Sequence, residues 1–391
     1  MKTPTLLISL VSAVAAALIA LGIGSWSGLF DGRTRTVVVP EAVPAGQATT
    51  VRNARPLLGN GFDPSGLYRR RSPGVVTIYA EFGATEAQGS GFVVTRTGVI
   101  LTSSHVITNA GDQIRGSTAT AASHVYVEFA DHDRVAARIV GWDVFDDVGV
   151  LQVDPKAHAL APVPLGRSSA VRVGQPVAVI GSPFGNENSL EVGVVSGIRR
   201  SIDSLTSSFR LSDAIQIDAP ITHGNSGGPV FDASGRVVGI AAQIRTETGG
   251  PEGVGFAVPI DSARRSLVEL LTTGKVAYAF VGVRTVDVTP TIAHALGLPV
   301  TRGALVVTVD RGSGAASAGL RQGSTERVID GVSVRPGGDV ILAIGGRSVD
   351  SGEDIARLVA ERLRPGQTVP FTVLRGGRRI VLQVHLGTRK S

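Results

Sequence analysis

Residues 222–229 read Thr-His-Gly-Asn-Ser-Gly-Gly-Pro and follow an apolar segment, residues 214–219, that we expect to form a strand. Glycines on both sides of Ser226 permit a tight turn whose backbone N–H groups converge on one point. A serine hydroxyl becomes an effective nucleophile only when a base and such an oxyanion-binding turn surround it. The same glycines also suit an ordinary turn between two strands, so the rest of the chain has to distinguish these readings.

The composition favours a β-rich protein of two or three domains. The 391 residues include 50 glycines and 43% hydrophobic residues, but only 5% aromatic ones. Basic residues give a net charge of +6, yet they are scattered and are not interleaved with aromatic side chains, which argues against a nucleic-acid partner. The absence of cysteine excludes a thiol nucleophile, disulfides and a cysteine-ligated metal site. We expect no metal and no cofactor.

The N-terminus predicts a membrane segment. No charged residue lies between Lys2 and Asp31, and residues 6–23 are almost wholly apolar, which is about the length of a membrane-spanning helix. Small-residue cleavage patterns lie inside the apolar run, so we favour an uncleaved transmembrane anchor at 1–30 over a cleaved signal peptide. Both readings place the rest of the chain outside the cytoplasm. Residues 31–66, rich in Pro, Gly, Ala and Thr, are expected to be a flexible linker.

From residue 72 onward, short β-branched runs alternate with turn residues, which is typical of a barrel or a sandwich. We expect a helix capped by Asp261 or Ser262 and ended by Gly274. An α+β unit of about a hundred residues follows, and one of its helices opens with the capping box Ser351–Asp354. The expected strands of the β-rich region are 75–81, 91–94, 125–129, 135–140, 148–153, 177–181, 192–198, 214–219, 237–241 and 253–258.

The best base for Ser226 is His105, which follows an apolar strand pattern and has small neighbours that leave it room to face a cleft. His132 lies between two acids, as a metal ligand might, but its position between two strand patterns favours a hairpin tip. Asp147, at the start of the apolar run 148–151, is the expected orienting carboxylate, with Asp143 and Asp146 as surface alternatives. The order histidine, aspartate, serine is the chymotrypsin order.

The chain resembles the HtrA (Deg) family of trypsin-like serine proteases with a C-terminal PDZ domain. The matching segments are 72–76, 89–92, 101–106, 147–151, 180–185, 193–196, 215–219, 224–229 and 255–257. The resemblance implies a mainly β chymotrypsin/trypsin-like double barrel at 67–274, an α+β PDZ domain at 275–391, and an N-terminal transmembrane helix. It supports His105 as general base, Asp147 as its orienter and Ser226 as nucleophile, with an oxyanion hole built from Gly224, Asn225 and Ser226. The family usually has Asn-Pro where this chain has Thr222-His223.

In the C-terminal unit, Phe280, Val281, Gly282 and Val283 resemble the loop and strand with which family members bind a peptide carboxylate. Residues 312–320 also match the family pattern. Residues 321–336 are an insertion, within which 328–334 predict a hairpin with a type I′ turn.

The resemblance implies an extracytoplasmic endopeptidase, in the periplasm or outside the cell, that cleaves unfolded or damaged proteins and binds C-terminal peptides at its PDZ groove. The small wall residues 241–243 favour small or medium apolar side chains before the cleaved bond. The family precedent is a homotrimer, for which Phe62, Tyr68 and Phe82 are candidate contacts. The alternatives are a catalytically silent chaperone and a PDZ peptide sensor; the presence of all three triad residues argues against both.

Overall fold

The computed structural model describes residues 61–110, 119–182, 188–207, 209–222, 224–245 and 254–389. The predicted anchor at 1–30 lies outside the described residues, as do residues 31–60 of the predicted linker. Among the helices of the described ranges, none is both long enough and apolar enough to cross a membrane.

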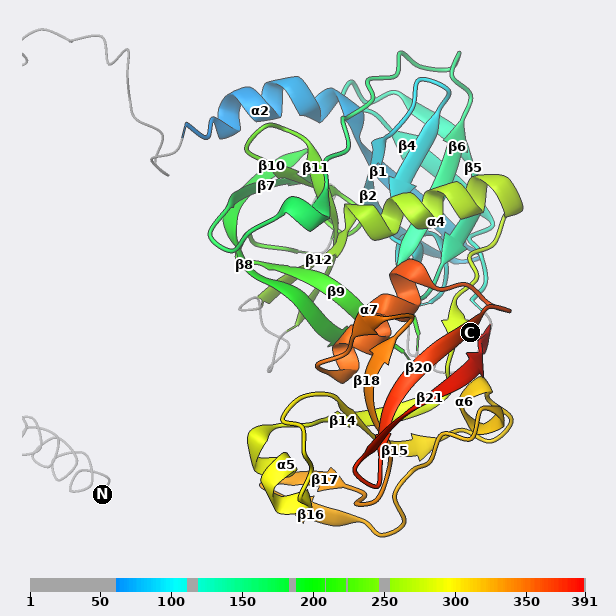
Figure 1. Ribbon diagram of the computed structural model, residues 1–391. Helices are drawn as coiled ribbons and strands as arrows, with labels where there is room; N and C mark the ends of the chain where they lie inside the picture. The colour runs from blue at the N-terminus through cyan, green and yellow to red at the C-terminus, as the bar shows by residue number, and fades with distance from the viewer. Residues whose placement is uncertain are drawn as a thin grey trace, which may run out of the picture. The chain divides into compact units, whose positions relative to one another are not determined.

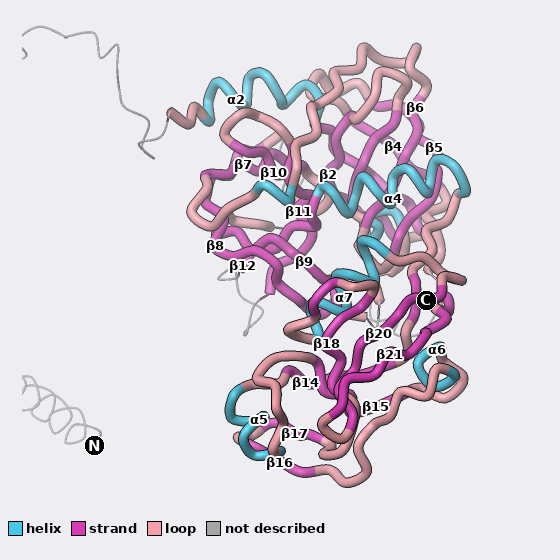
Figure 2. Tube along the Cα trace, viewed as in Figure 1, coloured by secondary structure: helices cyan, strands magenta, loops and turns pink. Residues whose placement is uncertain are grey.

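Two closed antiparallel barrels form the first part of the described chain (Figures 1 and 2). The first closes in the order β1-β2-β3-β6-β5-β4 and the second in the order β10-β11-β12-β9-β8-β7. The first barrel contains β1 (Val75–Phe82), β2 (Thr85–Val93), β3 (Val99–Thr102), β4 (His124–Glu128), β5 (Arg134–Asp143) and β6 (Val148–Val153). The second contains β7 (Pro176–Gly181), β8 (Ser189–Asp203), β9 (Arg210–Ile217), β10 (Pro229–Asp232), β11 (Val237–Arg245) and β12 (Val254–Pro259).

Each barrel buries side chains on both faces of its strands, because successive residues of a strand point to opposite sides. In β1, Val76 and Ile78 belong to the cluster of the first barrel, whereas Val75 joins a larger cluster that also holds Phe92 and Phe231. Since Phe92 comes from β2 and Phe231 from β10, this larger core joins the two barrels. The expectation of a mainly β protein built on two six-stranded barrels is confirmed.

Helix α2 (Pro64–Arg71) precedes the first barrel, and the Asp63 carboxylate caps it by accepting a hydrogen bond from Gly66 N (2.9 Å). Phe62 is only 1% exposed and packs in the core that joins the barrels. Of the three aromatic residues expected at a trimer contact, Phe62 is therefore buried in the core of its own chain, whereas Tyr68 and Phe82 are half-buried and keep some exposed surface. Short helical turns occur at η1 (Ser72–Gly74), α3 (Ser104–Ile107) and η2 (Ser168–Ala170).

Helix α4 (Ile260–Thr273) packs against β5 and β11 and ends at Gly274, which has φ 71°, as predicted (Figure 1). The predicted cap at Asp261 or Ser262 is wrong, because the helix already begins at Ile260 after Pro259. Asp261 lies in the first turn, and its carboxylate accepts a hydrogen bond from Ser169 N (3.0 Å) instead.

The C-terminal domain is an antiparallel sheet in the order β14-β15-β18-β20-β21, with three helices and two small two-stranded additions. The capping box of Ser351 and Asp354 at the start of α7 is confirmed, as is the type I′ hairpin, since Asp330 and Gly331 have φ 50° and 75°. The elements of the C-terminal domain are β13 (Ala279–Phe280), β14 (Val283–Asp287), α5 (Pro290–Leu296), β15 (Ala304–Val309), α6 (Gly314–Ser317), β16 (Arg327–Ile329), β17 (Val332–Val334), β18 (Val340–Ile344), β19 (Arg347–Ser348), α7 (Gly352–Arg362), β20 (Thr368–Arg375), β21 (Arg378–His385) and β22 (Gly387–Thr388).

Candidate active site

The loop that carries Ser226 joins β9 to β10. Asn225 N donates to the Thr222 carbonyl (3.0 Å), which closes a tight turn, and Gly224 has φ 101°. A side chain at Gly224 would be strained in that backbone conformation. Within the described residues, the backbone N–H groups of Gly224 and Ser226 donate no hydrogen bond to the protein. The loop therefore offers two donors to a negatively charged atom.

A side chain at Gly227 would clash with neighbouring atoms and strain the backbone. A Cβ at Gly227 would lie 2.2 Å from the Ser90 carbonyl oxygen and 2.3 Å from Thr102 Oγ1, and its φ is 84°. We expect Gly227→Ala to lower the free energy of unfolding by roughly 3 kcal/mol or more, measured by urea denaturation. Gly174→Ala is the matched control, since Gly174 has φ 82° but nothing within 4 Å of an added Cβ. The control should lose only about 1 kcal/mol; equal losses for both variants would contradict the steric explanation.

His105 lies in the single turn of helix α3, which begins just after β3 ends at Thr102. Its neighbours Ser104 and Val106 are buried, whereas the His105 side chain is 18% exposed. The one-turn helix thus directs the imidazole outward from a packed backbone. His105 was expected at the end of a strand, and the structure places it one helical turn beyond the end of β3.

Asp147 accepts three hydrogen bonds, two of them from His105. Its Oδ2 lies 2.8 Å from His105 Nδ1, and its Oδ1 accepts from His105 N (3.1 Å) and from Ser104 Oγ (2.8 Å). The carboxylate is only 7% exposed, and Asp147 has φ 51°. The bond from Nδ1 to Oδ2 fixes the plane of the imidazole, and the donors on Oδ1 hold the carboxylate in place. The structure therefore brings His105 and Asp147 together as predicted.

The Ser226 loop and α3 meet at the same residue of β2. A Cβ at Gly89 would lie 2.5 Å from Val106 Cγ2 and 3.1 Å from the Ser226 carbonyl oxygen. The Ser226 hydroxyl donates to the Ala242 carbonyl (3.2 Å), and the side chain keeps some exposure. A glycine at position 89 thus allows the serine loop of the second barrel to approach the helix that bears His105.

Asp143 and Asp146, expected to be surface residues, are instead buried: their exposed fractions are 2% and 8%, so that expectation is wrong. Asp143 accepts hydrogen bonds from Ser266 Oγ (2.7 Å) and Tyr278 OH (2.6 Å). Asp146 pairs with Arg265 (2.7 Å). Burial and the neighbouring Asp143 raise the pKa of Asp146 above its ordinary value. These contacts hold the turn that precedes Asp147 against α4 and the start of the C-terminal domain.

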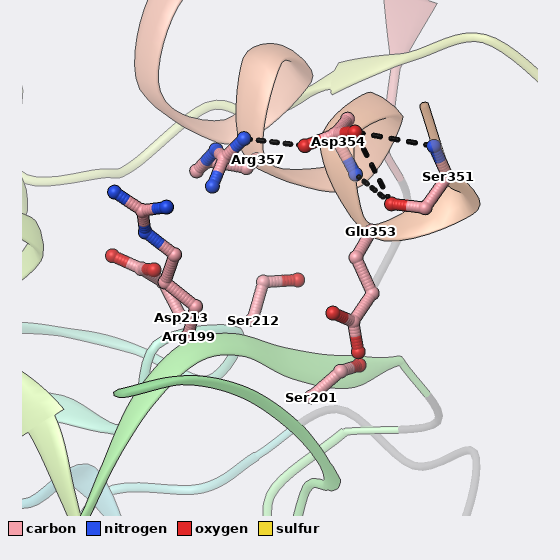
Figure 3. Close-up of a pocket in the computed structure, with 8 residues that line it drawn as sticks. All are labelled: Arg199, Ser201, Ser212, Asp213, Ser351, Glu353, Asp354 and Arg357. Carbon is pink, nitrogen blue, oxygen red and sulfur yellow. Dashed lines mark hydrogen bonds and ion pairs between the residues drawn. The ribbon is translucent and has the colours of Figure 1, made fainter. Parts of the chain in front are cut away.

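A separate polar pocket lies between strands β8 and β9 and the beginning of α7 (Figure 3). Asp213 and Arg199 both face it from β-strands, and both have positive φ, 64° and 56°. Burial, followed by the charge of Glu361, raises the pKa of Asp213 to about 6. Arg357 forms an ion pair with Asp354 on the α7 side of this pocket.

The pKa of Asp213 predicts a pH-dependent stability. Because its pKa in the folded state is raised, the folded protein binds more protons than the unfolded chain between about pH 4 and 6, so this residue's contribution falls as pH rises through that window. Asp213→Asn removes the free-energy cost of holding an ionised carboxylate at this half-buried site. Screening by solvent limits this cost to about 1 kcal/mol. Differential scanning calorimetry should therefore show a Tm gain of roughly 2–4 °C at pH 7.5 and no gain at pH 4.

Asp330→Asn is the matched control for this measurement, since Asp330 has φ 50° and is exposed. Its Tm should not change relative to the wild type between the two pH values. A gain for Asp213→Asn that is the same at pH 4 and pH 7.5 would contradict the electrostatic explanation.

The predicted carboxylate-binding segment begins in β13 and continues into β14. Gly282 has φ 80°, and a Cβ there would lie 2.2 Å from Ser313 Cβ, so the loop needs glycine at this position. The Gly282 carbonyl accepts from Asp310 N (2.9 Å) and the Val281 carbonyl from Ala315 N (3.0 Å), so both carbonyls point inward. In the described part of the chain, Val281 N and Gly282 N donate no hydrogen bond. These two donors are compatible with binding of a carboxylate.

Sequence reasoning missed the buried polar residues that support the site. Ser104 directly precedes His105, and Ser90 lies inside a segment already matched to the family, but neither was assigned a role. The sequence does contain one signal for such residues: a serine within a run of apolar and small residues is expected to be buried, and its hydroxyl then requires hydrogen-bond partners. The partner of Ser104 lies 43 residues away in the sequence and that of Ser90 lies 134 residues away, so the local sequence pattern does not reveal either of them.

Comparison with known proteins assigns both parts of the chain. Residues 89–240 match the trypsin-like peptidase domain, and residues 279–386 match the PDZ domain. The chain is 36% identical to Protease Do-like 1, chloroplastic, of Arabidopsis thaliana, over 77% of this chain and 64% of that protein. It is also 36% identical to a probable periplasmic serine endoprotease DegP-like of Hahella chejuensis, over 79% and 59% of the two chains. The chain thus spans about three fifths of the length of these relatives.

Among solved structures, the HtrA-type protease AlgW with a tripeptide is similar with a TM-score of 0.70 and 32% identity. The match covers 84% of this chain and 98% of that one. Since it extends through both barrels and the C-terminal domain, this similarity concerns the whole described architecture. The chain therefore belongs to the HtrA family of trypsin-like proteases that carry a PDZ domain.

Proposed function

We propose that this protein is a serine endopeptidase whose triad consists of His105, Asp147 and Ser226. The observation that carries the proposal is the 2.8 Å contact of His105 Nδ1 with Asp147 Oδ2, next to the loop that bears Ser226. Nδ1 bonded to a carboxylate leaves Nε2 as the nitrogen that can accept a proton from Ser226. His105, Asp147 and Ser226 come from segments more than forty residues apart in the sequence, and a catalytic triad requires such segments to come together in the fold.

In the proposed reaction, Ser226 Oγ attacks the substrate carbonyl carbon as His105 Nε2 takes the hydroxyl proton. Asp147 stays ionised and stabilises the imidazolium, which then protonates the leaving amine. The N–H groups of Gly224 and Ser226, with Asn225 between them, would donate to the oxyanion of the tetrahedral intermediate. Water attacks the acyl-enzyme in the same way and releases Ser226.

The substrates we propose are unfolded or damaged proteins, cleaved after small or medium apolar residues. Asp218 does not supply a charge for a basic substrate side chain: it is exposed, and its carboxylate accepts a hydrogen bond from Val194 N (2.5 Å). The wall residues Ala241 and Ala242 are small and buried. An apolar, modest primary pocket is consistent with these residues.

The C-terminal domain is proposed to bind the C-terminal carboxylate of a peptide through Phe280, Val281, Gly282 and Val283, and to regulate cleavage or deliver substrate. The support is the pair of backbone donors at Val281 and Gly282 and the edge position of β14, which leaves one side of the strand open to a peptide. The solved relatives are described with a tripeptide and with a decapeptide.

We further propose an extracytoplasmic location with membrane attachment through residues 1–30, a linker at 31–66, a protease domain at 67–274 and a PDZ domain at 275–391. The relative from Hahella chejuensis is named periplasmic, which supports the location. A homotrimer, as the family resemblance implies, would use Tyr68 and Phe82, which keep exposed surface.

A proteolysis assay on an unfolded protein such as reduced casein tests the function directly. Cleavage should occur mainly after Val, Ile, Leu or Ala, and its rate should change when peptides with apolar C-termini are added. A PDZ sensor or silent chaperone would bind the same peptides and leave casein intact. Absence of cleavage with and without such peptides would overturn the proposal.

A further inference from the structure

Ser90 lies in β2 of the first barrel, but its polar atoms contact the loop of the second barrel that bears Ser226. It is 0% exposed. Its N–H donates to the Ser226 carbonyl (2.7 Å), and its hydroxyl donates to the Gly224 carbonyl (2.6 Å). The same hydroxyl accepts a hydrogen bond from Ser182 N (2.9 Å), and the Ser90 carbonyl accepts one from Thr102 Oγ1 (2.7 Å). Every polar atom of Ser90 is therefore used.

The two carbonyls that Ser90 binds flank the peptide group between Asn225 and Ser226. A hydrogen bond on the Gly224 carbonyl fixes the plane of the peptide that follows Gly224, and a hydrogen bond on the Ser226 carbonyl fixes the plane that follows Ser226. The N–H group of Ser226 belongs to the peptide between these two fixed planes. The carbonyl of this same peptide, that of Asn225, accepts a hydrogen bond from Gly228 N (2.9 Å), so the direction of the Ser226 N–H depends on this bond together with the bonds that hold the two neighbouring planes.

Gly224 makes such a restraint necessary. With φ at 101° and no Cβ, its backbone has more accessible conformations than any other residue would have there. Loss of a hydrogen bond between two buried groups is costly in free energy, because water cannot reach either group to replace the missing partner. The space vacated by a single hydroxyl is smaller than the volume that a water molecule needs. The Ser90 hydroxyl thus adds to the restraint that the bond from Asn225 N to the Thr222 carbonyl places on the peptide after Gly224.

We propose that Ser90 is a positioning residue for catalysis: its hydroxyl holds the Gly224 carbonyl, so that the N–H group of Ser226 remains aimed at the developing oxyanion. This inference rests on the proposed function of Ser226. It assigns a catalytic consequence to a residue of the first barrel that does not contact substrate. It also distinguishes two supports of the site, since Ser104 holds Asp147 whereas Ser90 holds the oxyanion loop, residues 224–228.

Ser90→Ala tests the proposal, because it removes the hydroxyl and keeps both backbone hydrogen bonds. We expect kcat on a peptide substrate to fall about 10- to 100-fold, less than the full loss of an oxyanion donor, with KM unchanged. Affinity for a peptide boronate, whose tetrahedral adduct places an oxygen in the oxyanion hole, should fall by a similar factor. The acid limb of the pH profile of kcat/KM should not move, because the His105–Asp147 pair is untouched.

Thr77→Val is the matched control. Thr77 is buried beside Ser90 and donates to Ser182 Oγ (2.6 Å), so this variant also removes one buried hydroxyl at the same barrel contact. It should leave kcat and boronate affinity within about twofold of the wild type. If Ser90→Ala does not fold, as judged by its thermal transition, Ser90→Cys retains a weak donor and should give an intermediate loss of boronate affinity.

The outcomes separate the two proposals. A folded Ser90→Ala protein with wild-type kcat and boronate affinity, or one in which only KM changes, overturns the role of Ser90 and leaves the protease intact. An equal loss in Thr77→Val would reduce Ser90 to a general packing role. A wild-type protein that fails to react with a fluorophosphonate, even with added C-terminal peptides, overturns the proposed function and the role of Ser90 with it.

Discussion

Replacing Ser226 with alanine is expected to reduce kcat by on the order of a millionfold. In the proposed mechanism this hydroxyl forms the acyl bond, and residues 224–228 contain no second serine and no cysteine that could replace it. The remaining rate would come from substrate binding and the oxyanion donors alone. The measurement is peptide hydrolysis by purified protein, together with covalent labelling by a fluorophosphonate.

The fold should survive this change, because among the described residues Ser226 Oγ makes one hydrogen bond, to the Ala242 carbonyl (3.2 Å), and Ser226 is partly exposed. The thermal transition of Ser226→Ala should therefore stay within a few degrees of the wild type. Ser234→Ala, in the exposed turn after β10, is the matched serine control and should label normally. Labelling of Ser226→Ala at the wild-type rate would show that another residue is the nucleophile.

Asp147→Asn is expected to reduce kcat by about ten-thousandfold at neutral pH. The carboxylate accepts from Ser104 Oγ, His105 N and His105 Nδ1, and an amide offers only one oxygen to these three donors. If the amide nitrogen faces His105, it requires Nδ1 to accept, which places the proton on Nε2. In this tautomer the imidazole cannot take the proton of Ser226, so catalysis fails although the residues keep their positions.

Measurement of kcat and KM for Asp147→Asn between pH 6 and 10 tests this explanation. KM should remain near the wild-type value, because Asp147 does not contact substrate. Asp133→Asn is the control, since Asp133 lies in the exposed hairpin between β4 and β5. A loss below tenfold for Asp147→Asn would mean that the orientation of His105 does not depend on this carboxylate.

Local sequence patterns predicted those features whose causes are local. The αL residue Gly274, the capping box Ser351–Asp354 and the Asp330-Gly331 turn depend on backbone preferences of a few neighbouring residues, and each was predicted correctly. The start of α4 was predicted wrongly, because the Asp261 carboxylate binds Ser169 N, almost a hundred residues away, and is therefore not the cap. The surface assignment of Asp143 and Asp146 failed for a similar reason: Ser266, Arg265 and Tyr278, which bury them, come from a distant part of the chain.

The sequence by itself determined the chemistry that this protein can perform: one serine among glycines, a histidine and an aspartate in the chymotrypsin order, and no cysteine. It also determined the alternation of short strands that closes into barrels. Only the tertiary structure decided how the site is supported. Ser90 acquires its partner where the two barrels meet, Ser104 binds Asp147 within the first barrel, and the buried turn before Asp147 is bound by Tyr278 at the start of the C-terminal domain. The physical reason is that backbone preference acts over a few residues, whereas a buried hydroxyl or carboxylate must find its hydrogen bonds wherever the folded chain brings them.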